Sequence, residues 1–534
     1  MRRTRPLQPY ALLWCVVATA VLGVPSCGSD GEEAPQGQNR GGSPAGGSAT
    51  QGGAAPSGGD AQSGATTRGG SGTTGSLATG GGTASTLGGN SASGGAATAG
   101  ANNGAPNGGV AGNPASGGAG RAEGGSAGAS VPVGGAGGSA GAGGGASPKG
   151  AWTPTFETTA LSSDFYSEGA GIGDIDQDGV LDLVAGPVWY KGPDFQRGGE
   201  LFAPPELSRD QYSVFFLTFL DDLDGDGYLD VIGIGDAGGG NGSGNPNSHW
   251  YKNPGARAGG AWTKSVMYDG LVSNESPAYI DVVGDERKEL IFMTNRQLGY
   301  ATPGATAATP WTFTSISGPT EFGTPYVHGL GIGDIDGDGL NDIVERSGWW
   351  KQPAAQGGAW ERHEVDFGAP LGNSRPNNWG GAQMQVFDVD ADGDADVITS
   401  LTGHGYGLVW HEQTDDPDSF EPHEILPAAA GVGNLSQLHA TALADINGDG
   451  LLDLVTGKRY YAHPSNNADP GTEDPPEIRW FELVRSAGSA SFTSHVIHSA
   501  SGVGCNFTIA DVDGNGRLDV FVANKHGVFL HRQQ

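Results

Sequence analysis

A nine-residue acidic motif recurs along this chain and constrains the fold more than any other feature. Six close copies are DIDQDGVLD from Asp174, DLDGDGYLD from Asp222, DIDGDGLND from Asp334, DVDADGDAD from Asp388, DINGDGLLD from Asp445 and DVDGNGRLD from Asp511. A degenerate copy, DVVGDERKE, begins at Asp281. Successive copies start 48 to 66 residues apart, the length of one compact supersecondary unit. The repeat therefore predicts seven similar units.

The motif has the ligand pattern of a calcium loop. Positions 1, 3, 5 and 9 carry Asp or Asn, and position 6 is Gly in the six close copies, where a sharp turn needs a positive φ. Position 7 varies freely, which suits a backbone carbonyl ligand. Oxygen ligands in a tight loop suit Ca²⁺, so about six structural calcium ions are expected. The predicted ligands are Asp174, Asp176, Asp178, Val180, Asp182, Asp222, Asp224, Asp226, Tyr228, Asp230, Asp334, Asp336, Asp338, Leu340, Asp342, Asp388, Asp390, Asp392, Asp394, Asp396, Asp445, Asn447, Asp449, Leu451, Asp453, Asp511, Asp513, Asn515, Arg517 and Asp519.

Two other interpretations of the motif fit less well. An EF-hand has a bidentate Glu at position 12 and lies between helices, whereas β-branched runs such as VIGIG and VITSL follow this motif directly. A metal-free Asp-Gly turn would explain one copy, but six copies with the same ligand positions favour calcium. The degenerate copy lacks the position-3 ligand and the turn Gly, so no calcium is expected there. Arg287 and Lys288 are expected to neutralise its remaining acids, Asp281, Asp285 and Glu289, in part.

The segments between the motifs predict the fold. Each unit reads as a strand into the loop, a strand out, a strand bearing Trp or Tyr, such as VWYKGP or GWWKQP, and a fourth strand such as AWTKSVMY. Seven units of four antiparallel strands without helices predict an all-β, seven-bladed β-propeller. The seventh unit ends one strand short. The segment 151–160, AWTPTFETTA, is expected to supply that strand and to close the ring without free edges.

With these loops and strands, residues 151–534 resemble the FG-GAP/VCBS repeat proteins, which include the integrin α head. The resemblance rests on the DxDxDGxxD loops and implies a propeller with calcium in hairpin loops. A looser resemblance, carried by HGLGIGDIDGDG, TGHGYG and TGKRYYAH, is to the propeller of aldos-2-ulose dehydratase. This chain lacks the cupin domains of that enzyme.

The N-terminal 150 residues differ in kind from the rest. Residues 1–26, with a basic start and the apolar run YALLWCVVATAVLGV, predict a lipoprotein-type signal peptide with lipidation of Cys27. Residues 27–150 are rich in Gly, Ser and Ala and predict a disordered tether. We therefore expect export and a lipid anchor at a bacterial outer membrane or cell surface, with a periplasmic or secreted protein as the alternative.

Charge and cysteine content limit the partners. The formal net charge of -32 argues against nucleic acid and against an anionic membrane surface. Only Cys505 would remain in the propeller, so no intrachain disulfide is possible there, and we expect it to be a small buried residue. A monomer bound to the membrane only through the anchor is expected.

Ligands of such propellers usually meet the face opposite the calcium loops, where innermost strands begin and second strands end. The catalytic candidates on this face are His328, His404, His439, Lys458, His463 and His526. The ligand-binding candidates are Glu168, Glu275, Arg296, Arg346, Gln383, Arg459, Asn506 and Lys525. The His and Glu side chains could also hold an additional transition metal on the propeller axis. Structural or solvated roles are the alternative for each single His.

Two classes of function remain open. The first is a binding module that recognises a carbohydrate or an extracellular protein, with calcium as a structural ion. The second is a carbon–oxygen lyase or dehydratase that acts on sugars. The absence of a recognisable catalytic motif and the long tether favour the binding module, whereas the polar density of the axial face favours the enzyme.

Overall fold

The fold is described from a computed structural model. It describes residues 152–236, 246–255, 260–306, 309–319, 322, 326–368, 380–381, 383–414, 416–463, 469–486 and 489–534. The expected signal peptide, the lipidation site Cys27 and the expected tether lie outside this part of the chain. Within it, no helix has the length and apolar character that a membrane crossing requires.

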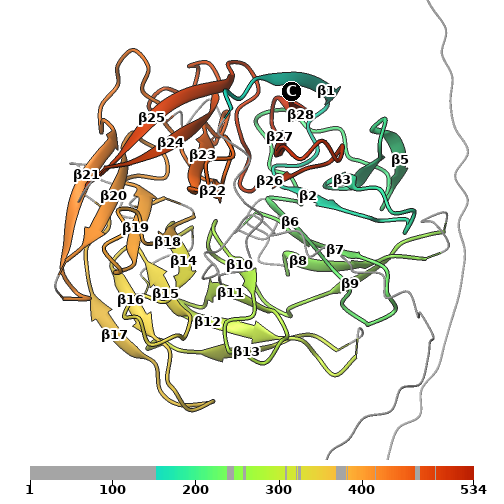
Figure 1. Ribbon diagram of the computed structural model, residues 1–534. Coiled ribbons are helices and arrows are strands. Elements are labelled where there is room, and N and C mark those ends of the chain that lie inside the picture. Colours follow the sequence, from blue (N-terminus) through green and yellow to red (C-terminus); the bar gives the residue numbers. More distant parts are fainter. Residues whose placement is uncertain are drawn as a thin grey trace, which may run out of the picture. The chain divides into compact units, whose positions relative to one another are not determined.

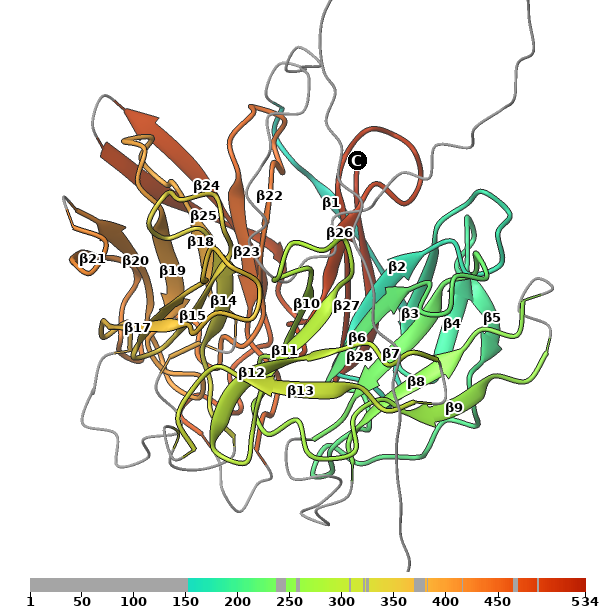
Figure 2. The same ribbon diagram turned by 90° about the horizontal axis from the view of Figure 1, so that it is seen from below.

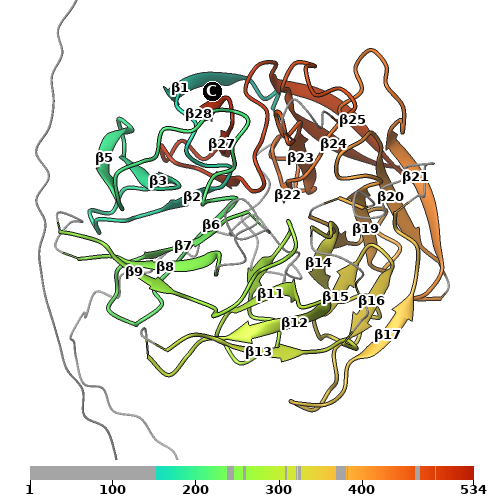
Figure 3. The ribbon, with the colours of Figure 1, turned by 180° about the vertical axis from the view of Figure 1, so that it is seen from behind.

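Seven antiparallel four-stranded sheets surround one axis, which confirms the predicted seven-bladed propeller (Figure 1). Figure 2 shows the ring from the side, and Figure 3 shows its opposite face. The first four blades, in order, are β2 (Ala170–Gly173), β3 (Asp182–Ala185), β4 (Val188–Lys191) and β5 (Gln196–Glu200); β6 (Leu217–Asp221), β7 (Asp230–Ile234), β8 (Ser248–Lys252) and β9 (Thr263–Val266); β10 (Ala278–Ile280), β11 (Glu289–Thr294), β12 (Gln297–Thr302) and β13 (Thr312–Ser315); and β14 (Leu330–Gly333), β15 (Asp342–Glu345), β16 (Gly348–Lys351) and β17 (Glu361–Glu364).

The last three blades follow the same order. They are β18 (Gln385–Phe387), β19 (Asp396–Ser400), β20 (Leu408–Gln413) and β21 (Phe420–Leu426); β22 (Thr441–Ala444), β23 (Asp453–Gly457), β24 (Ile478–Ser486) and β25 (Ser489–His498); and β26 (Thr508–Ala510), β27 (Asp519–Asn524) and β28 (Gly527–Gln533) with β1 (Phe156–Ser162). Each calcium-type motif joins the innermost strand of a blade to its second strand.

The N-terminal strand closes the ring, as expected. β1 pairs antiparallel with β28, from Phe156 opposite Gln533 to Ser162 opposite Val528. The strand begins five residues later than the segment 151–160 suggested, and the preceding Trp152 donates from Nε1 to Gln533 Oε1 at 3.0 Å. Because β1 covers the free edge of β28, the seventh blade has the four strands of the others.

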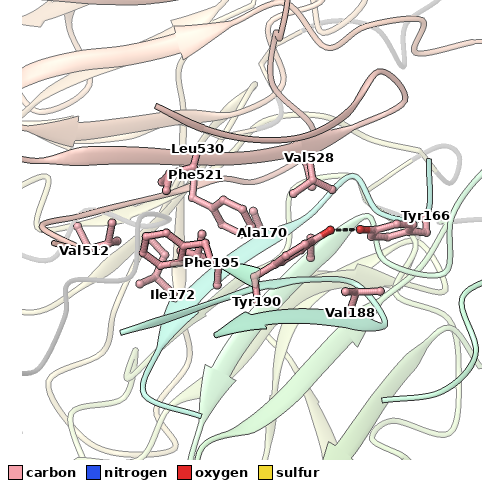
Figure 4. Close-up of a cluster of buried hydrophobic side chains, with 14 residues drawn as sticks. Tyr166, Ala170, Ile172, Val188, Tyr190, Phe195, Val512, Phe521, Val528 and Leu530 are labelled. Atoms are coloured by element: carbon pink, nitrogen blue, oxygen red, sulfur yellow. Dashed lines mark hydrogen bonds between the residues drawn. The ribbon is translucent and has the colours of Figure 1, made fainter. Parts of the chain in front are cut away.

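The apolar core lies between blades rather than within one central layer. Among the described residues, seven clusters of buried apolar side chains form, one at each interface between neighbouring blades. Figure 4 shows the cluster between the seventh and first blades, where Phe521 and Leu530 meet Ile172 and Phe195. Cys505 is a fully buried free thiol, as expected, and burial raises its pKa well above the usual range.

Close approach of the innermost strands explains the recurring GIG sequences. A Cβ atom on Gly331 would lie 2.7 Å from the carbonyl oxygen of Met384 in the next blade. A larger residue there would push neighbouring innermost strands apart, so glycine lets the blades converge at the axis.

Three histidines of the fourth strands have a packing role. His363, His423 and His495 stack on Trp349, Trp410 and Trp480 of the adjacent third strands, with ring centroids 3.9, 4.5 and 4.3 Å apart. Each pair is directly opposite in the strand register. These histidines therefore belong to the outer packing of blades four to six and not to the axial face.

Candidate functional site

The six close copies of the acidic motif form tightly turned loops. In the loop that begins at Asp334, the two carboxylate oxygens of Asp334 accept hydrogen bonds from the backbone N–H groups of Asp338 and Gly339 at 3.0 and 2.8 Å. Gly339 has a φ of +87°, and a Cβ there would meet nothing within 4 Å. Glycine is therefore needed for the backbone conformation and not for space, as predicted.

The position-9 carboxylate of each loop is buried under the turn. Asp342 accepts from the N–H groups of Ile335 and Gln352 at 3.0 and 2.8 Å, and burial raises its pKa to about 7. The equivalent carboxylates with the same backbone contacts are Asp182, Asp230, Asp396, Asp453 and Asp519. The loops therefore hold several carboxylates close together, one of them out of contact with water.

The position-3 and position-5 carboxylates attract cations. In three blades the last residue of the third strand is a lysine, Lys191, Lys252 or Lys351, and its ammonium group pairs with both carboxylates. These lysines come two residues after the first Trp of the strand, and in the fifth and sixth blades Glu412 and Glu482 hold that position instead. Carboxylates of positions 1, 3 and 9 group within 4.8 Å in the loops at Asp174 and Asp222. Such groups can hold a metal ion, and their donors are all oxygen atoms, which fits a hard cation.

The degenerate loop at Asp281 keeps the same backbone shape. Asp281, Asp285 and Glu289 still bring three carboxylates within 4.8 Å. Lys288, which was expected to neutralise these acids in part together with Arg287, pairs its ammonium with Asp221 of the second blade at 3.3 Å. Glu286, at the turn position, has a φ of +70°.

Replacing Glu286 with glycine is expected to stabilise the protein by about 1 kcal/mol, because a side chain with a Cβ is strained at this φ. Urea unfolding of the full chain measures the change. Glu286→Ala is the matched control, since it removes the same carboxylate but keeps the Cβ. Equal stability of the two variants would show that backbone strain at this position is negligible.

The axial face gathers four predicted site residues from four consecutive blades. We call Glu275, His328, His404 and His439 the axial cluster; one ligand atom of each lies within 4.8 Å of the others. Oε2 of Glu275 is 3.6 Å from Nε2 of His328 and 3.7 Å from Nε2 of His439. The three innermost-strand positions occupied by Glu275, His328 and His439 are equivalent, whereas His404 comes from a second-strand exit. All four side chains are buried.

Hydrogen bonds define the tautomers of two of these histidines. His439 Nδ1 is 3.1 Å from the carbonyl oxygen of Gln437, which can only accept, so Nδ1 carries the proton. His404 Nδ1 is 3.1 Å from Asp469 Oδ2. Burial lowers the pKa of His404 to about 4 and that of His439 well below its usual value. Both imidazoles are therefore neutral at pH 7, with a lone pair on Nε2.

Arg459 links the axial cluster to the first blade. Its guanidinium donates to Glu168 Oε1 at 3.0 Å and to Glu275 Oε2 at 2.7 Å, and it lies 4.9 Å from the ring centroid of Phe216. Burial alone would raise the pKa of Glu275, but Arg459 and His328 hold it well below the usual range. Glu275 is therefore a carboxylate inside the ring.

The remaining candidates are spread around the cluster. His463 Nδ1 lies 2.8 Å from Asp469, and the ammonium of Lys458 contacts Ser436 and the carbonyl of Gly471. Lys525 lies 4.4 Å from the ring centroid of Tyr212, and His526 is exposed beside Tyr460. Gln383 Oε1 accepts from the N–H of Thr441 in the next blade, and the amide of Asn506 bonds the backbone N–H and carbonyl of Thr218 in the second blade, beyond the first. Arg296 bonds the carbonyl of Phe322, and Arg346 is half-buried in the fourth blade; neither joins the axial cluster.

The sequence interpretation missed two features of this face. Asp469, which holds both His404 and His463, lies in the long β23–β24 connection and belongs to no repeat position. The second feature is a group of partly or fully exposed side chains, here called the axial rim. It consists of Arg209, Tyr212, Tyr406, Tyr460, Glu473 and His526. Connecting segments of differing length carry these residues, so the repeat pattern contains no signal for them.

No family model and no curated protein sequence matches this chain. An Agrocybe aegerita lectin that recognises non-reducing terminal N-acetylglucosamine is similar in fold, with 14% identity, coverage of 70% of this chain and 86% of that chain, and a TM-score of 0.40. Rhamnogalacturonan lyase YesW is similar in fold with 16% identity, coverage of 71% of this chain and 76% of that chain, and a TM-score of 0.34. BBS1N, solved in complex with ARL6DN, has 12% identity, coverage of 71% of this chain and 96% of that chain, and a TM-score of 0.39. Likeness at this level carries no argument about function, and the FG-GAP/VCBS resemblance stays a prediction.

Proposed function

We propose that this chain is an exported, lipid-anchored, calcium-binding propeller that binds a carbohydrate at the axial rim. The observation that carries the proposal is the set of partly exposed aromatic and charged side chains of the axial rim, four of which, Arg209, Tyr460, Glu473 and His526, are linked by contacts. Arg209 donates to the Tyr460 hydroxyl at 3.3 Å and lies 4.2 Å from the ring centroid of Tyr461. Its guanidinium is also 3.7 Å from Glu473.

Other rim residues make aromatic and hydrogen-bond contacts. The Tyr460 and His526 rings are 5.2 Å apart, and the Tyr406 hydroxyl donates to Asp474 at 3.3 Å. Aromatic faces can stack on the C–H faces of a sugar ring, while charged and hydroxyl groups bond its hydroxyls. This mixture favours a carbohydrate over a flat protein surface, because charged groups such as Arg209 and Glu473 lie beside the rings and no purely apolar patch forms from the rim residues.

Calcium has a structural part in the proposal. The acidic loops lie at the ends of the innermost strands, away from the rim, and offer oxygen donors alone. Calcium bound there would neutralise buried and half-buried carboxylates and hold each β-hairpin in place. The ions would support the blades that carry the rim without touching the ligand.

Binding of the purified full chain to an array of bacterial and plant polysaccharide fragments tests the proposal, followed by calorimetry with the best ligand. Tyr460→Ala is expected to weaken binding at least about tenfold, which corresponds to about 1.4 kcal/mol. Tyr300→Ala, which removes a half-buried tyrosine of β12, should bind as the unmodified chain does. A chain that binds no glycan, or whose binding is unchanged by Tyr460→Ala, would contradict the assignment.

A second candidate is a sugar lyase or dehydratase, and the pair of His463 and Asp469 favours it. Asp469 is within hydrogen-bond distance of Nδ1 of His463, an arrangement that leaves the lone pair on Nε2 when the imidazole is neutral, and this side chain is 22% exposed. An imidazole oriented by a buried carboxylate has the arrangement of a general base. It could take a proton from a sugar carbon while the neighbouring C–O bond breaks and the leaving oxygen is protonated.

The same glycans distinguish the two functions. A lyase would convert them to products with a carbon–carbon double bond, which absorb in the ultraviolet. His463→Ala would then abolish the product while leaving binding intact. Glycans that bind but stay unchanged would support the binding module alone.

A further inference from the structure

We propose that the axial cluster of Glu275, His328, His404 and His439 holds one divalent transition-metal ion on the propeller axis. This site is separate from the acidic loops, and it does not depend on the carbohydrate proposed for the rim. Its four ligands come from the third, fourth, fifth and sixth blades.

The separations fit ligands of a single ion. Two ligands that each lie about 2.1 Å from an ion are about 3.0 to 4.2 Å apart, depending on the angle between them. The Glu275 oxygen is 3.6 and 3.7 Å from Nε2 of His328 and His439. These distances are too long for a hydrogen bond and too short for a water molecule between the atoms.

The protons on the imidazoles point away from the centre. His439 uses its Nδ1 proton on the Gln437 carbonyl, and its buried Nε2 has no hydrogen-bond partner among the described residues. That lone pair faces the Glu275 carboxylate, which Arg459 keeps ionised, so two acceptors face each other in a buried space. A cation between them removes this unfavourable contact, whereas an empty site retains it.

Outer contacts orient the ligands as in known metal centres. A carboxylate, Asp469, receives the Nδ1 proton of His404, and a backbone carbonyl receives that of His439. This arrangement fixes each ring with Nε2 toward the ion and increases its basicity. Arg459 pairs with both Glu168 and Glu275, so its single positive charge faces two carboxylates, and Glu275 Oε2 would contact both the guanidinium and the ion.

The donor set selects the class of metal. Three imidazole nitrogens and one carboxylate oxygen suit zinc, iron, cobalt or nickel, whereas calcium prefers an all-oxygen set. An ion bound to these four side chains would tie four consecutive blades together at the axis. It would also be linked through the His404 ring to Asp469, which in turn bonds His463.

Cobalt titration of the full chain tests the site. The chain is stripped of metals by chelation and returned to saturating calcium, so that the acidic loops are filled, and Co²⁺ is added with detection of its visible absorption. We expect one equivalent to bind with the spectrum of nitrogen ligation, and one equivalent of Zn²⁺ to displace it. His404→Ala and His439→Ala should weaken Co²⁺ binding at least about 100-fold, and Asp469→Asn about 10- to 100-fold.

His249→Ala, which changes a half-buried histidine of β8 in the second blade, is the matched control and should bind Co²⁺ unchanged. A folded, calcium-loaded wild-type chain that binds no Co²⁺ and no Zn²⁺ would overturn the proposal, even if every variant failed to fold. Equal binding by His404→Ala and His439→Ala would also overturn it, because the ion would then lie elsewhere. Neither result depends on glycan binding, so this proposal and the carbohydrate assignment can fail separately.

Discussion

Arg459→Leu is expected to destabilise the propeller by about 3 to 5 kcal/mol, the usual cost of removing one partner from a buried ion pair. The guanidinium is 1% exposed and neutralises two carboxylates, Glu168 of the first blade and Glu275 of the third. Leucine fills much of the volume but leaves both charges buried. Urea unfolding of the full chain, with calcium present, measures the loss.

Two variants separate charge from packing in this experiment. Arg197→Ala removes an exposed arginine paired with Glu200 and should cost less than about 1 kcal/mol. Adding Glu168→Gln to Arg459→Leu removes one of the unpaired charges and should restore part of the stability. A loss below about 1 kcal/mol for Arg459→Leu would mean that water or an ion reaches the axis and compensates the carboxylates.

Calcium removal is expected to have the largest effect of all. An ion that binds only the folded state adds about 1.4 kcal/mol when its free concentration is ten times its dissociation constant. Six independent loops would then add about 8 kcal/mol, which a calcium chelator would remove. Thermal and urea unfolding of the full chain with calcium, with chelator and with magnesium measure this difference.

A single-loop variant calibrates the effect. Asp334→Asn removes one ligand charge and should lower the bound calcium by one ion, and the calcium-dependent stability by about 1.4 kcal/mol. Magnesium should replace calcium poorly, because it demands a stricter octahedral geometry. If chelation changed the unfolding free energy by less than about 1 kcal/mol, the acidic loops would be turns without a structural ion.

The sequence alone determined the repeated architecture. The blades share local signals: β-branched runs for the strands, an Asp-rich turn with Gly at a position of positive φ in six of them, and a Trp in the third strand of five. Because most copies carry these signals, a deviation in one copy does not change the count. Even the closing strand was predictable, since the last unit visibly lacks a strand that residues near Trp152 supply. The bounds of this strand differ from the expected 151–160, since it runs from Phe156 to Ser162.

The tertiary structure alone decided which axial residues meet. The equivalent positions before the innermost strands hold Glu168, Glu275, His328, His439 and Cys505, and no local rule says which of them touch. Glu168 of the first blade and Arg459 of the sixth are 291 residues apart and bond directly, because both side chains reach the axis where the blades converge. Asp469 and the rim residues lie in connections of differing length, which the repeat does not constrain. Contacts at the axis depend on the convergence of seven blades, and local sequence periodicity contains no information about that convergence.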